Sequence, residues 1–201
     1  MADFMINDSL RFVSREEWEP IHPRLGHIVR RSDRTHVIIH HTVGPADTDP
    51  TPIVWEDDTE IFKAMRTLQT SHDPDLGPDI PYNFVAFAQP THLTICEGRG
   101  EDRSGAHTKG HNTRGIAVSF SGNYEANDMP SDLLTVQLDA LSSFLHWLKT
   151  SASHPAYGDF EPMSNLGSLR PDSRTVFAHR DFKPTACPGR HLISRLTAIN
   201  F

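Results

Sequence analysis

Short runs of consecutive apolar residues, separated by polar and glycine-rich stretches, recur along the chain and predict buried strands. The run HVIIHHT at 36–42 contains three successive β-branched residues, which is typical of a central strand buried on both faces. Similar runs predict strands at 82–88, 92–99 and 115–121, and the three residues between the first two of these suggest a hairpin-like connection. A further short apolar run at 176–178 also reads as a strand.

Apolar residues at three- and four-residue spacing predict two amphipathic helices, at 55–71 and 131–150, and a closing helix is expected at 190–199. Ser131 is the expected N-cap of the second helix. Ser14, with a glutamate three residues later, resembles a capping box at the start of a short helix. Strands mixed with a few helices indicate an α/β fold, with a central mixed sheet of about five or six strands and helices on both faces.

Length and charge narrow the possible function classes. The 201 residues fit a single domain, 1–201, in which 151–174 reads as a polar linker without an assigned role. No apolar run approaches the ~20 residues of a membrane helix, so no membrane insertion is expected. The net charge of −7 argues against nucleic acid as a partner, since phosphate binding needs clustered Lys and Arg. We expect a monomer.

The candidate chemistry lies mainly near the C-terminal end of the chain. The strand at 176–178 delivers His179 into a loop rich in turn formers, and Cys187 follows eight residues later. Imidazole and thiolate are good zinc ligands, and a catalytic zinc keeps three protein ligands and one open position. The third ligand is expected from His40 or His41, of which only one reaches a given face. The alternative is a hydrogen-bonded loop histidine and a packed thiol.

Other polar residues leave their roles open at this stage. Tyr82 opens a strand after a loop, where its phenol could lean over a metal, or it is a core tyrosine with a satisfied hydroxyl. Glu97 is either a base or the partner of a neighbouring arginine. Ser119 and Ser121 lie within a strand without a G-x-S-x-G elbow, so a serine triad is not supported. Cys96 reads as a packing residue if Cys187 binds metal.

Six stretches together resemble the zinc amidase domain shared by peptidoglycan-recognition proteins and phage or bacterial N-acetylmuramoyl-L-alanine amidases. They occur in the order of the family and run over most of the chain, from 12 to about 196. The stretches are FVSREEW (12–18), HVIIHHT (36–42), DIPYNFVAF (79–87), EGRGEDRSGAHTKGHN (97–112), GIAVSFSGNY (115–124) and AHRDFKPTACPG (178–189).

The resemblance implies roles residue by residue. It implies one zinc per chain, held by the ligands His40, His179 and Cys187. It implies a catalytic tyrosine at Tyr82 and an oxyanion donor at Thr185, where some members carry lysine. It implies a groove for muramyl peptide that contains His72, His107 and Asn112. Pro81 departs from the glycine that usually precedes the tyrosine, and proline stiffens that approach.

The implied activity is hydrolysis of the amide between N-acetylmuramic acid and the L-alanine of the stem peptide, with bacterial peptidoglycan as partner. The competing class is a non-catalytic peptidoglycan-binding recognition module, in which the cysteine ligand is typically lost. No signal peptide is recognisable, and the disulfide of animal members lacks its cysteines. We therefore expect a phage endolysin that is made in the host cytoplasm and reaches the cell wall after holin-mediated release.

Overall fold

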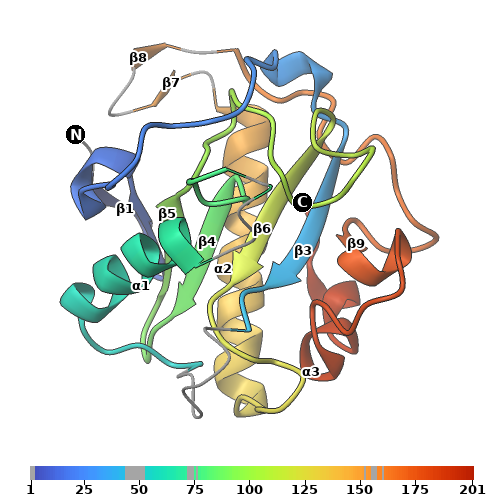
Figure 1. Ribbon diagram of the computed structural model, residues 1–201. Coiled ribbons are helices and arrows are strands. Elements are labelled where there is room, and N and C mark those ends of the chain that lie inside the picture. The colour runs from blue at the N-terminus through green and yellow to red at the C-terminus, as the bar shows by residue number, and fades with distance from the viewer. Residues whose placement is uncertain are drawn as a thin grey trace.

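A seven-stranded mixed sheet forms the centre of the computed structural model (Figure 1). The structure describes residues 3–43, 53–71, 75, 77–151, 153–154, 158–159 and 161–201. The strands of this sheet, in spatial order, are β1 (Asp3–Asn7), β2 (Leu10–Val13), β5 (Leu93–Glu97), β4 (Phe84–Ala88), β6 (Gly115–Phe120), β3 (His36–His41) and β9 (Phe177–Ala178).

Parallel and antiparallel pairs are combined in the sheet. The β1–β2 and β4–β5 pairs are antiparallel, and the other four neighbouring pairs are parallel. The α/β class and the mixed sheet are as predicted, but the count of five or six strands is too low. The difference arises from β1 and β2, which lie in an N-terminal segment whose short apolar runs had indicated no strand.

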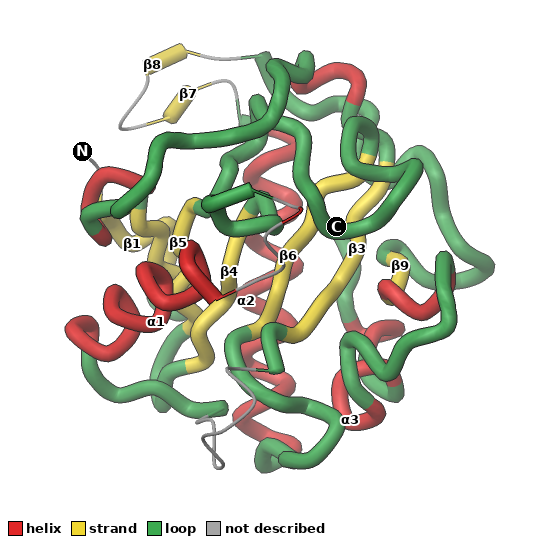
Figure 2. Tube along the Cα trace, viewed as in Figure 1, coloured by secondary structure: helices red, strands yellow, loops and turns green. Residues whose placement is uncertain are grey.

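Helices cover both faces of the sheet, as Figure 2 shows. The helix α2 (Ser131–Thr150) packs its leucines on the face that carries Val37 and Ile39 of β3. The helix α1 (Asp58–Ser71) packs with Trp18 on the opposite face, over side chains of β2, β4 and β5. The even-numbered residues of β3, including His40, point to the α1 side because strand side chains alternate.

Several helix boundaries differ from the sequence-based expectation. The 3₁₀ helix η1 (Arg15–Trp18) follows Ser14, which accepts a hydrogen bond through its backbone carbonyl and makes no side-chain cap. Ser131 lies inside α2, and its Oγ accepts a hydrogen bond from Arg195 instead of capping. The helix α1 begins at Asp58, later than predicted, and the preceding Trp55 N–H donates to Ala88 O of β4 at 2.8 Å.

The C-terminal part of the chain contains more and shorter secondary-structure elements than predicted. A two-stranded pair, β7 (Ser153–His154) and β8 (Gly158–Asp159), lies within the expected linker. The closing helix divides into α3 (Arg190–Ile193) and the 3₁₀ helix η5 (Leu196–Ala198). Two further 3₁₀ turns are η2 (Arg31–Asp33) and η4 (His179–Asp181). No helix in the described ranges is long and apolar enough to cross a membrane.

Candidate metal centre

Three side chains converge where β3 and β9 end. Ile39 of β3 is in register with Ala178 of β9, so the next residues along the two strands, His40 and His179, lie side by side. Their ring centroids are 4.4 Å apart. His40 Nδ1 lies 3.6 Å from Cys187 Sγ, and one ligand atom from each of His40, His179 and Cys187 lies within 4.8 Å of the other two.

His41 points to the other side of β3 and has a different task. Its backbone N–H donates a hydrogen bond to Cys187 Sγ at 3.4 Å. Its ring Nδ1 accepts a hydrogen bond from the Tyr124 N–H at 3.2 Å. The alternation of the strand therefore separates the two histidines, as expected, and leaves His41 to hold the segment after β6.

The loop that carries the cysteine is closed by its own polar groups. The Asp181 carboxylate accepts a hydrogen bond from the Ala178 N–H at 2.7 Å and pairs with Arg174 at 3.0 Å. The Arg180 N–H donates to Cys187 O at 3.1 Å. These bonds fold the loop so that His179 and Cys187, eight positions apart in the chain, lie next to each other.

Burial keeps the two imidazoles neutral. Desolvation, together with the nearby Lys183 charge, lowers the pKa of His179 from 6.5 to about 4. The pKa of His40 is also lowered well below its ordinary value, first by burial and then by the neighbouring His107 and His179. Burial raises the pKa of the Cys187 thiol to about 12, against the His41 N–H and Lys183, which both lower it. A cation is therefore needed to make Cys187 a thiolate.

The donor set fits a zinc ion. Zinc–nitrogen bonds of ~2.0–2.1 Å and a zinc–sulfur bond of ~2.3 Å at tetrahedral angles place nitrogen and sulfur about 3.5 Å apart. The distance from His40 Nδ1 to Cys187 Sγ, 3.6 Å, matches this value. In addition, His179 Nε2 is buried without a hydrogen-bond partner among the described residues, which is costly unless something binds there.

Tyr82 lies beside the cluster, with its ring centroid 5.1 Å from that of His40. Its pKa is raised by burial of the hydroxyl and by proximity to Cys187, while the Ser119 hydroxyl lowers it. The side chain remains partly exposed. The phenol therefore keeps its proton next to the cluster.

Thr185 is placed by the cysteine loop. Its Oγ1 accepts a hydrogen bond from the Cys187 N–H at 3.2 Å. A hydroxyl accepts and donates at the same time, so the O–H of Thr185 is left to donate elsewhere. The residue is half-buried beside Cys187.

The three residues expected to line a substrate groove differ in where the structure places them. His107 lies against His40, with its Nδ1 3.2 Å from His40 Nε2. Asn112 is close by, but its Oδ1 accepts hydrogen bonds from the N–H groups of His107 and Thr108, both at 2.9 Å. Its carbonyl end thus shapes the loop, and only its amide nitrogen is left for a ligand. His72 lies outside the described residues.

The sequence relatives of the chain are named either peptidoglycan-recognition proteins or N-acetylmuramoyl-L-alanine amidases. No protein-family model matches the chain. Peptidoglycan-recognition protein SC1a of Drosophila melanogaster is 26% identical over 159 residues, which are 79% of this chain and 69% of that protein. Human N-acetylmuramoyl-L-alanine amidase is 33% identical over 159 residues, again 79% of this chain but 23% of the human protein.

The chain belongs to the family of peptidoglycan-recognition proteins and N-acetylmuramoyl-L-alanine amidases. The fold agrees: wild-type Drosophila PGRP-LB superposes with a TM-score of 0.66 at 23% identity, covering 94% of each chain. A tyrosine-to-phenylalanine variant of the same PGRP, solved in complex with tracheal cytotoxin, gives a TM-score of 0.65 at 23% identity and 92% coverage of each chain.

Two residues near the candidate metal centre, Lys183 and Ser119, are not assigned a role by the sequence alone. Lys183 places a positive charge near the cluster, where it lowers the pKa of both His179 and Cys187. Ser119 is in register with His40 on the same face of the sheet, and its buried hydroxyl interacts with that of Tyr82, whose pKa it lowers. Lys183 could have been noticed in the H-R-D-x-K segment, whereas Ser119 looked like an ordinary strand residue.

A buried ion-pair network holds the segment before Tyr82. Asp79 pairs with Arg15 at 2.8 Å, and Arg99 donates to Ile80 O at 2.8 Å. Glu97 pairs with Arg24 at 2.9 Å and accepts a hydrogen bond from the Arg15 N–H. Of the two roles that the sequence left open for Glu97, the structure therefore selects the ion pair. Cys96 and Cys187 are both free, and Cys96 is fully buried in the core.

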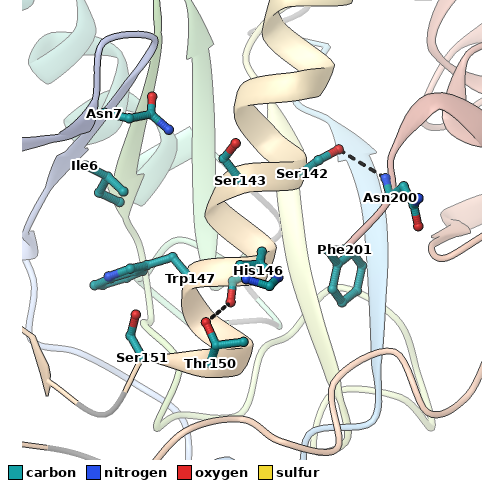
Figure 3. A pocket seen from close by; sticks show the side chains of 10 residues that line it. All are labelled: Ile6, Asn7, Ser142, Ser143, His146, Trp147, Thr150, Ser151, Asn200 and Phe201. Atoms are coloured by element: carbon teal, nitrogen blue, oxygen red, sulfur yellow. Dashed lines mark hydrogen bonds between the residues drawn. The ribbon is translucent and has the colours of Figure 1, made fainter.

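A depression of about 470 Å³ lies on the outer side of α2 (Figure 3). It is lined by residues of α2 together with Ile6, Asn7, Ser151, Asn200 and Phe201. The Asn200 N–H donates to Ser142 Oγ at 3.1 Å and ties the C-terminal end to the helix. Because α2 covers the face opposite His40, this depression is separate from the candidate metal centre.

Proposed function

We propose that the chain is a zinc-dependent N-acetylmuramoyl-L-alanine amidase that cleaves the amide between N-acetylmuramic acid and L-alanine of the stem peptide. The observation that carries this proposal is the convergence of two neutral imidazoles and one thiol with a protonated tyrosine beside them. The family includes amidases, and the human amidase is the relative with the higher identity of the two described above.

His40, His179 and Cys187 would hold one zinc per chain. When bound, zinc supplies Lewis acidity and lowers the pKa of a water from 15.7 to about 7. The three protein ligands leave a fourth position open, as hydrolytic centres require. On zinc binding the Cys187 thiol would lose its proton to water, and the His41 N–H, which donates to Sγ at 3.4 Å, would stabilise the thiolate.

Tyr82 and Thr185 are the proposed donors to the oxyanion. Tyr82 keeps its proton because burial raises its pKa, so its O–H donates at neutral pH. Thr185 has its acceptor side occupied by the Cys187 N–H, which directs its own proton elsewhere. Thr185 carries no charge, but Lys183 brings a positive charge to the same loop. This charge favours a developing oxyanion.

The proposed substrate is the muramyl peptide of bacterial peptidoglycan. His72, His107 and Asn112 are the groove residues that the family resemblance implies, and His107 and Asn112 lie next to the centre. A PGRP of the same fold has been solved with tracheal cytotoxin, which supports a ligand of this class.

The deciding test pairs metal analysis with product analysis. The purified protein should contain one zinc per chain and release new N-terminal L-alanine from purified peptidoglycan, without new reducing sugar. Cys187→Ser is the matched variant and should lose both zinc and release. Zinc without release of alanine, together with binding to the wall, would instead identify a recognition module.

We further propose that this activity serves lysis of a host cell by a phage endolysin that reaches the wall from the cytoplasm. The two free cysteines, neither in a position to form the disulfide of animal members, support this assignment. Purified protein should clear suspensions of cells whose walls are exposed by outer-membrane permeabilisation, and Cys187→Ser should not. Cleavage of soluble muramyl peptides without any effect on whole walls would count against a lytic role.

A further inference from the structure

His107 contacts the candidate metal centre through a ligand rather than directly. Its Nδ1 lies 3.2 Å from His40 Nε2 and 3.1 Å from Thr108 Oγ1. The two imidazole rings meet edge to face, with centroids 5.1 Å apart. Both side chains are buried, at 1% exposure for His40 and 8% for His107.

The position of Cys187 decides which nitrogen of His40 faces the metal. Cys187 Sγ approaches His40 Nδ1, on the side of the ring away from the His107 contact. A neutral imidazole has one N–H and one lone pair, so metal binding at Nδ1 requires the proton on Nε2. His40 Nε2–H then donates to His107 Nδ1, and His107 must carry its own proton on Nε2.

The loop around His107 holds the ring in this position. Asn112 Oδ1 binds the His107 backbone N–H at 2.9 Å. A side chain at Gly105 would place its Cβ 2.2 Å from the His107 ring, so glycine is required for the ring to lie there. His107 Nε2 itself is buried and has no hydrogen-bond partner among the described residues. An unpaired buried N–H is costly and calls for an acceptor.

We propose that His107 is a positioning residue that couples the metal to the substrate. It accepts the hydrogen bond from His40 Nε2–H, which commits His40 Nδ1 to zinc, and it is thereby fixed as an Nε2–H donor to an oxygen of the bound muramyl peptide. This inference rests on the proposed zinc amidase function. It assigns to His107 a role in metal affinity that a residue serving only the substrate would lack.

The first test measures zinc affinity by competition with a chromophoric chelator, without substrate. His107→Leu removes the acceptor and should weaken zinc binding by ~10–100-fold, the usual effect of losing the partner of a ligating histidine. His107→Gln keeps an acceptor oxygen and should recover most of the affinity. The matched control is His111→Leu in the same loop, because His111 pairs with His36 and does not touch a ligand. It should bind zinc as the wild type does.

The second test reads the proton positions directly in the wild-type protein. Long-range ¹H–¹⁵N spectra of the histidine rings, recorded during zinc titration, should show His40 and His107 both as Nε2–H tautomers in the loaded protein. An Nδ1–H tautomer of His107 in that state would overturn the coupling, even if His107→Leu does not fold. Unchanged zinc affinity in folded His107→Leu would overturn it equally. Failure of the wild type to bind zinc would instead defeat the proposed function.

Discussion

His40 Nδ1 and Cys187 Sγ lie 3.6 Å apart, although 147 positions separate the two residues in the chain. The contact forms because β3 and β9 are parallel neighbours, so both strands end at the same edge of the sheet. A bend stabilised by Asp181 then returns the cysteine to that edge. The ligand geometry is thus a product of strand pairing, and changes to either strand end should be visible in metal binding.

Cys187→Ser should abolish the stabilisation that zinc provides. A ligand at one hundred times its dissociation constant raises the free energy of unfolding by about 2.7 kcal/mol, so wild-type protein should gain this amount with zinc and the variant almost none. Thermal unfolding with and without zinc measures the difference. Cys96→Ala is the control, because Cys96 is buried far from the cluster in β5 and its loss should lower stability but keep the zinc effect.

Tyr82→Phe should keep zinc and lose activity. Removing one oxyanion donor typically costs ~10²–10³ in kcat, whereas the ring contact with His40 remains. Steady-state kinetics on a muramyl peptide, with metal content measured in parallel, separates the two effects. Tyr124→Phe is the matched control, since that hydroxyl donates to Ile53 O at 3.5 Å and has no other hydrogen bond in the described part of the chain. Near-wild-type kcat in Tyr82→Phe would remove the tyrosine from the mechanism.

Gly189→Ala should damage both the fold and the metal site. Gly189 has φ +95°, and an added Cβ would lie 2.4 Å from the Tyr124 carbonyl carbon. We expect a loss of at least about 2 kcal/mol from strain and overlap, and weaker zinc binding because Cys187 is two residues away. Gly110→Ala separates the two causes: its φ is +85° but nothing lies within 4 Å. The control should cost about 1 kcal/mol and leave zinc affinity unchanged.

Ser119→Ala should be neutral or stabilising. Its Oγ is fully buried, and its contact with the Tyr82 hydroxyl does not reach hydrogen-bond geometry, so removing it relieves a poorly paired polar group worth about 1 kcal/mol. Thr94→Val gives the opposite case on β5, because Thr94 Oγ1 donates to Gln89 Oε1, and that variant should be destabilised. Urea unfolding of both variants measures the contrast. A clear loss of stability in Ser119→Ala would mean that the hydroxyl has a partner after all.

His36 should contribute to loss of stability in acid. Burial, with help from His111 and Arg34, lowers its pKa from 6.5 to about 4. The unfolded chain therefore binds a proton that the folded chain does not between these pH values. Stability falls as the pH drops through this range, by up to about 1.4 kcal/mol per pH unit for one proton.

His36→Phe should reduce the pH dependence of unfolding between pH 6.5 and 4 by about one proton, measured on metal-free protein by urea titration at several pH values. His40 and His41 also titrate below their ordinary values, so part of the dependence should persist. His146→Phe, on the exposed side of α2, is the control and should leave the slope unchanged. An unchanged slope in His36→Phe would contradict the assignment.

The amino-acid sequence by itself determined the elements whose signal is local. Strand and helix periodicity depends on residues that are close in sequence. The sequence therefore predicts the strands β3, β4, β5 and β6 from their apolar runs and the helix α2 from its leucine spacing. The zinc-ligand types and the family motifs are also local. The strands β1 and β2 are not predicted because segments of five and four residues are too short to show a strong period. The caps at Ser14 and Ser131 are wrong because capping depends on where the chain turns.

Only the tertiary structure decided which partner each polar group has. The sequence does not predict that Glu97 pairs with Arg24 or that the His107 ring contacts His40. It also does not predict that the Asn112 side-chain carbonyl accepts a hydrogen bond from the His107 N–H. The contacts of His40 with His107 and Cys187 join residues 67 and 147 positions apart, although the Asn112 bond to the His107 N–H spans only five. A hydrogen bond or metal contact requires atoms within about 3–4 Å, and only the packed sheet brings such distant groups that close.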